Sequence, residues 1–168
     1  MHEIMDSSMI YRSVKRMTHE ILENNKGADN LILVGIKTRG EFLALRIANF
    51  IKEIENKNVQ TYSIDISYWR DDLNQNIDIP NYSLDVEDKA VIIVDDVLYK
   101  GRTTRAALDA ITHFGRAKSI KLAVLIDRGH RELPIRADFV GKNIPTKSSE
   151  IVKVNLSEID LKDSVEIL

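Results

Sequence analysis

The sequence predicts a single α/β domain, residues 1–168, with a central and mostly parallel β-sheet flanked by helices. Three short, unbroken apolar runs, at residues 31–36, 91–94 and 121–126, are typical of strands covered on both faces. Apolar residues at helical spacing follow the first two runs, and no repeat or linker divides the chain. Because ligands bind beyond the carboxyl ends of parallel strands, we expect the polar loops after these two runs to share one site.

The composition favours a soluble, cytoplasmic protein. Apolar residues make up 43% and charged residues 30% of the chain, the balance of a globular domain. The absence of cysteine excludes disulfides and thiolate metal sites. Residues 1–10 lack the pattern of a secretion signal, and no run approaches the roughly 20 apolar residues of a membrane span, so we expect no membrane partner. A net charge of -2 argues against a general polyanion binder but leaves a local basic face open.

The first half of the chain predicts two helices and two strands. Ser7 or Ser8 caps a helix that ends at Gly27, with Ile10, Val14, Met17 and Ile21 on its apolar side. The strand at 31–36 leads through a polar loop to a helix at 41–53, whose expected apolar stripe is Phe42, Leu45, Ala48, Ile51 and Ile54. Alternation from Tyr62 to Tyr68 predicts a half-exposed strand.

The second half predicts a long loop and further strand-and-helix units. The polar stretch from Trp69 to Asp88 is typical of a mobile loop or hairpin, and loops of this length often act as lids. The strand at 91–94 is followed by a helix that ends at Gly115 and carries Ala107, Leu108, Ile111 and Phe114. A third buried strand at 121–126 precedes a basic loop at 127–138, and apolar runs at 151–156 and 165–168 complete the chain.

The strongest chemical signal follows the second strand. Asp95 and Asp96 come directly after it, and Gly101-Arg102-Thr103-Thr104 then opens a helix. A glycine turn at a helix start presents amides and hydroxyls to a phosphate, while paired carboxylates accept hydrogen bonds from ribose hydroxyls. The alternative is an ordinary capped helix with solvated acids. Because the Walker and dinucleotide glycine motifs are absent, triphosphatase and dinucleotide functions are disfavoured.

The segment from Val91 to Thr104 resembles the phosphoribosyl pyrophosphate (PRPP) motif of type I phosphoribosyltransferases. Segments 34–40, 68–73, 127–138 and 141–146 are similar to the branch that joins uracil phosphoribosyltransferase activity to attenuation of pyrimidine operons. The resemblance covers almost the whole chain. Two departures are Lys100, where the family usually has a small hydroxyl residue, and a short loop between Asp72 and Asp88.

The resemblance implies the type I phosphoribosyltransferase fold, with a small hood and a mobile loop, and conversion of uracil and PRPP to UMP and pyrophosphate. Mg²⁺ would be held mainly by substrate oxygens and water, without a protein-only metal site. The implied catalytic residues are Asp95, Asp96, Arg39 and Arg70. The implied PRPP and nucleotide contacts are Lys37, Thr38, Arg39, Gly40, Asp71, Asp95, Asp96, Val97, Leu98, Tyr99, Lys100, Gly101, Arg102, Thr103 and Thr104.

Some of these assignments have plain structural alternatives. The resemblance places base recognition at Phe139 and Val140, by stacking and main-chain hydrogen bonds, whereas the sequence alone favours Phe139 as a core residue. The alternative for Arg39 and Arg70 is a surface charge, and it carries more weight for Arg70.

Basic residues also collect on the first helix and after residue 115, where solvated surface is the ordinary explanation. The resemblance implies instead that a homodimer, or a higher homo-oligomer, binds a stem-loop in pyrimidine operon leader mRNA, and that UMP or UTP promotes this binding. The matching residues are Lys15, Arg16, His19, Arg131 and Arg136. The alternatives are a purely metabolic salvage enzyme without specific RNA binding and a non-catalytic RNA regulator.

Overall fold

The computed structural model describes residues 1–71, 78 and 80–168. The elements in chain order are β1 (His2–Met5), α1 (Ser7–Asn25), β2 (Leu31–Ile36), α2 (Arg39–Glu55), β3 (Gln60–Ile64), the 3-10 turn η1 (Ser67–Trp69), β4 (Ala90–Leu98), α3 (Arg102–Phe114), β5 (Ser119–Asp127), β6 (Phe139–Asn143), β7 (Val152–Asn155), α4 (Ser157–Asp160) and β8 (Ser164–Ile167).

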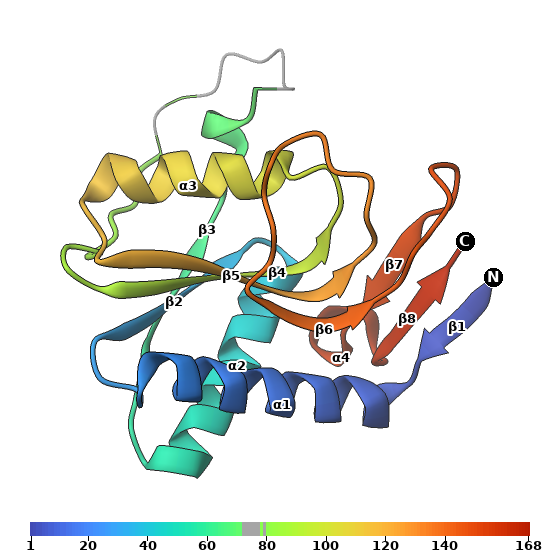
Figure 1. The fold of residues 1–168 in the computed structure, drawn as a ribbon, viewed down its shortest axis with the longest axis horizontal. Coiled ribbons are helices and arrows are strands. Elements are labelled where there is room, and N and C mark those ends of the chain that lie inside the picture. The colour runs from blue at the N-terminus through green and yellow to red at the C-terminus, as the bar shows by residue number, and fades with distance from the viewer. Residues whose placement is uncertain (72–77, 79) are drawn as a thin grey trace.

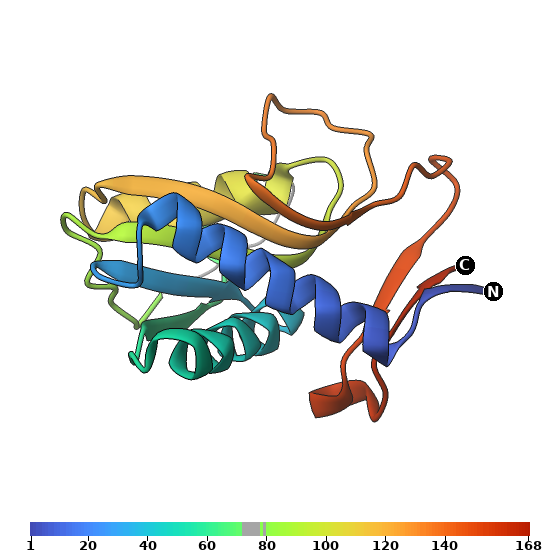
Figure 2. The same ribbon diagram turned by 60° about the horizontal axis from the view of Figure 1, so that its bottom comes forward.

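The central sheet has the strand order β3-β2-β4-β5-β6, and every neighbouring pair is parallel. Helices α1 and α2 cover one face and α3 covers the other, as Figures 1 and 2 show. Each face of the sheet therefore has its own apolar core, and the predicted α/β class with a parallel sheet is confirmed.

A small antiparallel sheet, β1-β8-β7, stands apart from the central sheet and forms the hood together with α4. In Figure 1 it lies at the end of the molecule where both termini meet. Arg46 of α2 fastens the hood, since its guanidinium donates to Glu158 and, at 2.9 Å, to Asp163 Oδ2. The sequence did not reveal β1 or α4, whose four-residue segments are too short to show a periodic pattern.

Two predictions about helices were wrong in detail. Asp6, rather than Ser7 or Ser8, caps α1, because its Oδ1 accepts the N–H of Met9 at 2.9 Å. The buried side of α2 lies one position from the predicted stripe, so that Leu45 is 45% and Ile54 37% exposed. The reason is that α2 packs against both the sheet and α1. Its buried residues are Gly40, Leu43, Ala44, Ile47, Phe50 and Ile51.

Two strand predictions also needed correction. The strand expected from Tyr62 to Tyr68 ends at Ile64, because Asp65 Oδ1 accepts both the backbone N–H and the hydroxyl of Ser67 and turns the chain into η1. Strand β4 continues to Leu98, so Asp95 and Asp96 lie within the strand rather than after it. Pairing with β5 continues to Leu98, whereas pairing with β2 stops at Val94.

The predicted mobile loop from Trp69 to Asp88 is described only in part, since residues 72–77 and 79 lie outside the described residues. The C-terminal part of this segment, which includes residues 82–86, packs against the rest of the domain. Leu84 and Val86 are buried, and the Tyr82 hydroxyl donates to the carbonyl of Asp65 at 2.9 Å. Among the helices of the described residues, none is long and apolar enough to cross a bilayer.

Candidate functional site

The predicted phosphate loop closes around a cavity of about 120 Å³ between β4 and α3. Gly101 has a φ of 93°, a conformation that favours glycine, and it stands at the N-cap of α3 without a capping side chain. The first amides of the helix therefore remain available to an anion. The cavity is lined by Arg70, Val97, Leu98, Tyr99, Lys100, Gly101, Arg102, Thr103 and Thr104.

Acidic side chains neutralise the charges at the mouth of this cavity. Asp71 Oδ2 accepts from Arg102 at 2.9 Å and from Arg105 at 2.8 Å. Glu132 lies on the other side of Arg102, with 3.4 Å between Arg102 Nε and Glu132 Oε1. Asp71, expected to meet pyrophosphate or metal, thus forms part of an ion-pair cluster in this state, and an incoming phosphate would compete with it for Arg102.

Asp95 and Asp96 lie in the strand that enters the phosphate loop, and both are partly buried. Asp95 Oδ1 accepts the N–H of Asp96 at 2.9 Å, and Asp96 Oδ1 accepts the N–H of Val97 at 2.8 Å. Burial raises the pKa of Asp95 well above its usual value, and the charge of Asp96 raises it further. Asp95 is therefore harder to ionise than an exposed aspartate, and hydrogen-bond donors or positive charge from a ligand would favour its charged form.

The predicted pyrophosphate loop, residues 37–40, connects β2 to α2 and contains a cis peptide between Lys37 and Thr38. Gly40 brings this loop directly against the acidic pair, because a Cβ here would lie 2.3 Å from the Val94 carbonyl and 3.2 Å from Asp95 Cα. Glycine permits this approach because it has no Cβ. The loop is thus adjacent to Asp95, in agreement with the expectation that the two polar loops lie at the same edge of the sheet.

Arg39 is anchored to the hood. Its Nη2 donates to Asp160 of α4 at 2.9 and 3.1 Å, and its buried Nε has no hydrogen-bond partner among the described residues. Hydrogen bonding by the N–H of Leu156 and by Arg39 lowers the pKa of Asp160. The structure therefore brings Arg70 and residues 97–104 to the phosphate cavity. The other predicted contacts are absent from its lining: Lys37, Thr38, Arg39, Gly40, Asp71, Asp95 and Asp96.

Phe139 and Val140, the predicted base-recognition residues, begin β6. The Phe139 side chain is buried in the core beneath α1, as the sequence alone favoured. The carbonyls of Val140 and Gly141 accept from Arg16 at 3.3 and 2.6 Å. A base-binding role for Phe139 and Val140 stays a prediction, and stacking on Phe139 would require its ring to leave the core.

The predicted RNA residues fall on two segments. Lys15, Arg16 and His19 belong to α1, where Lys15 lies 5.9 Å from the Tyr11 ring centre and Arg16 also pairs with Glu20 at 2.7 Å. Arg131 and Arg136 belong to the segment between β5 and β6, and Arg131 is paired with Asp127. His19 and Arg136 are exposed.

Three residues of the site were not singled out from the sequence as functional. Asp160 holds Arg39, Glu132 contacts Arg102, and Arg128 is 94% buried against Tyr99 and the segment before β7, being 6% exposed. Arg128 and Glu132 stand in a run of charged residues, where the sequence carries no signal that separates a buried charge from a solvated one.

Comparisons with known proteins identify the family of the chain. The family model described as phosphoribosyl transferase domain matches residues 1–158. A protein of Clostridium kluyveri named bifunctional protein PyrR is 57% identical, covering 98% of this chain and 95% of its own. A protein of the same name from Staphylococcus saprophyticus is 59% identical, covering 98% and 97%.

Solved structures share the fold. The hypoxanthine phosphoribosyltransferase of Trypanosoma cruzi, solved at 1.4 Å, superposes with a TM-score of 0.77 at 20% identity and covers 100% of this chain and 96% of its own. That of Staphylococcus aureus superposes with a TM-score of 0.74 at 21% identity, covering 97% and 89%. At this level of identity the likeness concerns the fold, and it confirms the predicted phosphoribosyltransferase fold.

Proposed function

The chain belongs to the phosphoribosyl transferase family, within the group of bifunctional PyrR proteins, and on this basis we propose a double function. The protein is a uridine-nucleotide-responsive RNA-binding regulator that attenuates transcription of pyrimidine biosynthesis genes. It is also a uracil phosphoribosyltransferase, which converts uracil and PRPP to UMP and pyrophosphate. The observation that carries the proposal is the cavity formed by Arg70 and residues 97–104 beside the acidic pair.

The cavity and the two elements beside it each suit one part of PRPP. The uncapped amides of α3, with the hydroxyls of Thr103 and Thr104, suit the 5′-phosphate. Asp95 and Asp96, directly upstream, suit the ribose hydroxyls, whose O–H groups donate to carboxylates. The loop at 37–40, which Gly40 holds against Asp95, suits the pyrophosphate.

The reaction breaks the bond between ribose C1′ and the pyrophosphate oxygen and forms a bond from C1′ to uracil N1, which loses its proton. Positive charge develops on the ribose as the anion departs, so stabilisation of that anion is the main demand on the protein. Arg39 and the amides of the loop at 37–40 serve this purpose, and Arg70 adds charge beside Thr103, 3.5 Å away. No dedicated nucleophile is needed.

Mg²⁺ bound to PRPP would neutralise part of the pyrophosphate charge. Within the described residues no group of three or more His, Cys, Asp or Glu is arranged to hold a metal ion. The acidic pair alone suits an ion that takes most of its ligands from substrate and water, as Mg²⁺ prefers.

For the RNA function, we propose that the basic side chains of α1 and of the segment before β6 contact a leader stem-loop. Lys15, Arg16 and His19 are partly or fully exposed along α1. Arginine matches phosphate geometry and stacks on unpaired bases, while histidine can also stack. Because this face is small, a homodimer would enlarge it enough to hold a structured RNA. PRPP, uracil and nascent mRNA are cytoplasmic, so we place the protein in the cytoplasm.

The test has two stages. UMP formation is first measured from uracil and PRPP with and without Mg²⁺. A pyrimidine leader hairpin is then titrated with and without UMP, using the complementary strand's hairpin as control. We expect the protein to form UMP and to bind the leader hairpin more tightly when UMP is present. Turnover with only weak binding, equal for both hairpins, would identify a salvage enzyme, and RNA binding without turnover would identify a non-catalytic regulator.

A further inference from the structure

We infer that Arg128 is the residue that couples the nucleotide cavity to the RNA-binding segment. This inference rests on the proposed function and assigns a route for its nucleotide response. Arg128 is absent from the lining of the phosphate cavity. It acts as a positioning residue, because it contacts Tyr99 of the phosphate loop and the segment at 146–150 that precedes the hood strand β7, and it directly follows Asp127, the partner of Arg131.

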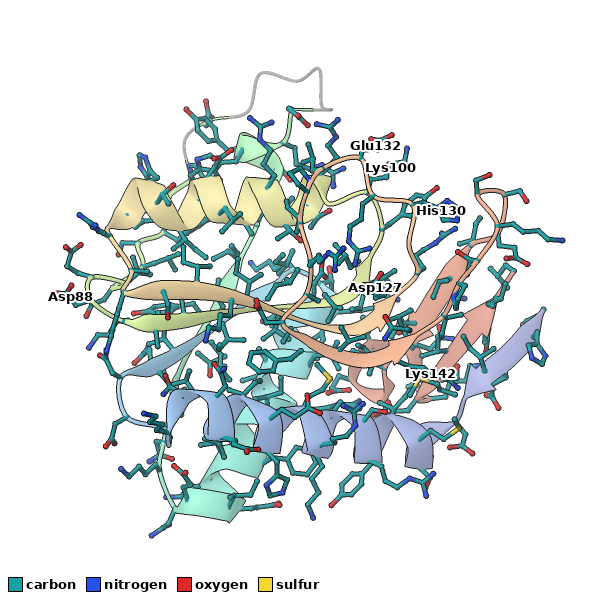
Figure 3. The ribbon with its side chains drawn as sticks, viewed as in Figure 1. Asp88, Lys100, Asp127, His130, Glu132 and Lys142 are labelled. Atoms are coloured by element: carbon teal, nitrogen blue, oxygen red, sulfur yellow. The ribbon has the colours of Figure 1, made fainter. Side chains whose placement is uncertain are left out.

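Backbone hydrogen bonds connect the phosphate loop to the segment that carries Arg131. The N–H of Arg128 donates to the Leu98 carbonyl at 3.2 Å, and the N–H of Glu132 donates to the Lys100 carbonyl at 2.9 Å. The Glu132 carboxylate also reaches the Lys100 ammonium, at 3.9 Å. Figure 3 shows Lys100, Glu132 and His130 at one corner of the molecule, above Asp127. A shift of the phosphate loop is therefore passed to the residues on both sides of Arg131.

The Arg128 side chain contacts both the phosphate loop and the segment at 146–150. Its guanidinium carbon lies 4.0 Å from the centre of the Tyr99 ring, which also meets the His130 ring edge-on. Its Nη2 donates to the carbonyls of Lys147 and Glu150 at 3.1 and 2.7 Å, and its Nε donates to Thr146 Oγ1 at 3.0 Å. A planar fork that stacks and donates in several directions at once is a property of arginine that lysine lacks.

Arg131 lies at the far end of this arrangement. It is paired with Asp127, the residue before Arg128, and its Nε is buried without a hydrogen-bond partner among the described residues. The ion pair with Asp127 therefore neutralises much of the charge of Arg131. A nucleotide that displaces Tyr99, which lines the cavity, moves the stacked Arg128 and His130 and thereby redirects Arg131 toward RNA. Coupling of this kind is reciprocal between the two ligands.

The test compares the wild type with Arg128→Lys. As matched control, Arg46→Lys changes another largely buried arginine that fastens the hood but contacts neither the phosphate loop nor Arg131 through any hydrogen bond of the described residues. For each protein, the affinity for UMP is measured first, and the affinity for the leader hairpin is then measured without UMP and at saturating UMP. Thermal unfolding is followed in parallel.

In the wild type and in Arg46→Lys, we expect UMP to tighten hairpin binding by roughly five-fold or more, within the usual range of coupling between two sites. In Arg128→Lys the ratio should fall close to one, although UMP still binds. RNA should likewise increase UMP affinity in the wild type but not in Arg128→Lys. Full tightening in Arg128→Lys overturns the inference.

Two further outcomes separate this inference from its premise. If UMP fails to tighten binding in the wild type, the nucleotide response itself is absent, and both the proposed regulation and the inference fall. If Arg128→Lys does not fold, Tyr99→Leu decides the matter, because it removes the stacked ring and leaves the hydrogen bonds of Arg128 in place. At UMP concentrations shown to saturate Tyr99→Leu, a ratio close to one supports the inference, and a wild-type ratio contradicts it.

Discussion

The two anion loops of the site occupy equivalent places but are built differently. Both follow parallel strands of the central sheet, β4 and β2, and both open a helix. The phosphate loop surrounds a cavity, and its Arg102 is paired with exposed acids that a ligand can displace. The pyrophosphate loop is instead packed against β4 through Gly40, and its Arg39 is held by the hood.

The comparison teaches that one half of the site is formed by local chain geometry and the other by tertiary packing. The turn at Gly101 and the start of α3 suffice for the first. The second depends on close contact between elements far apart in the chain, with Arg39 and Asp160 separated by 121 positions. Damage to the hood should therefore affect pyrophosphate handling before it affects binding of the 5′-phosphate.

The largest effect should come from the acidic pair, which lies between the two loops. Asp95→Asn together with Asp96→Asn keeps the shape but removes the charge that orients the ribose. We expect UMP formation to fall by at least about a thousandfold, the upper range for loss of a charged group that acts in the transition state. Steady-state kinetics measure this. Asp29→Asn with Asp85→Asn, at the opposite ends of the strands, should change turnover little.

Alanine substitutions of glycines distinguish the tightly packed pyrophosphate loop from the glycine turn of the phosphate loop. Gly40→Ala forces a Cβ to 2.3 Å from the Val94 carbonyl, so unfolding in urea should show a loss of about 1–3 kcal/mol, as for other overpacked sites. Gly101→Ala and Gly129→Ala meet no atom closer than 3.6 Å, but their φ values of 93° and 82° disfavour alanine. They should cost about 1–2 kcal/mol. A smaller loss for Gly40→Ala than for Gly129→Ala would show that α2 can move away from β4.

The basic side chains of α1 and of the segment before β6 extend the comparison to RNA binding. Arg131→Ala should spare UMP formation and weaken leader-hairpin binding about tenfold, with a salt dependence shallower by about one unit, as for a lost phosphate contact. Filter binding at several salt concentrations measures the slope. Equal loss of UMP formation and hairpin binding would show that the catalytic site and the basic face cannot be separated. Lys57→Ala, at the opposite ends of the strands, serves as control.

The smallest effect concerns pH. Since burial raises the pKa of Asp95, its neutral form stabilises the folded, ligand-free protein. That contribution is fully present below the unfolded pKa, about 4, and is lost as pH rises toward the folded pKa. In urea unfolding, the stability of the wild type relative to Asp95→Asn should therefore fall between pH 4 and 8, whereas carboxylates with lowered pKa values, such as Asp160, contribute equally to both proteins. An identical pH dependence in both proteins would contradict this assignment.

Much of the site was predictable because it is local. The phosphate loop could be identified from residues 95–104, since strand, glycine turn and helix start follow one another within ten positions. The packing of α2 could not, because its many apolar residues allow several stripes and the choice is made by α1 and the sheet. The roles of Asp160 and Arg128 depend on partners at long range, which no spacing in the sequence reports.

The pairing of β1 with β8 joins the two ends of the chain, with His2 opposite Ile167. Contacts between such distant residues carry the greatest loop-closure entropy, so we expect the hood to form late in folding. The parallel sheet and the phosphate loop need only residues up to β6. A growing chain would thus acquire its phosphate-binding turn before the clamp on Arg39, and a chain that loses either end would keep the sheet while its pyrophosphate loop stays unanchored.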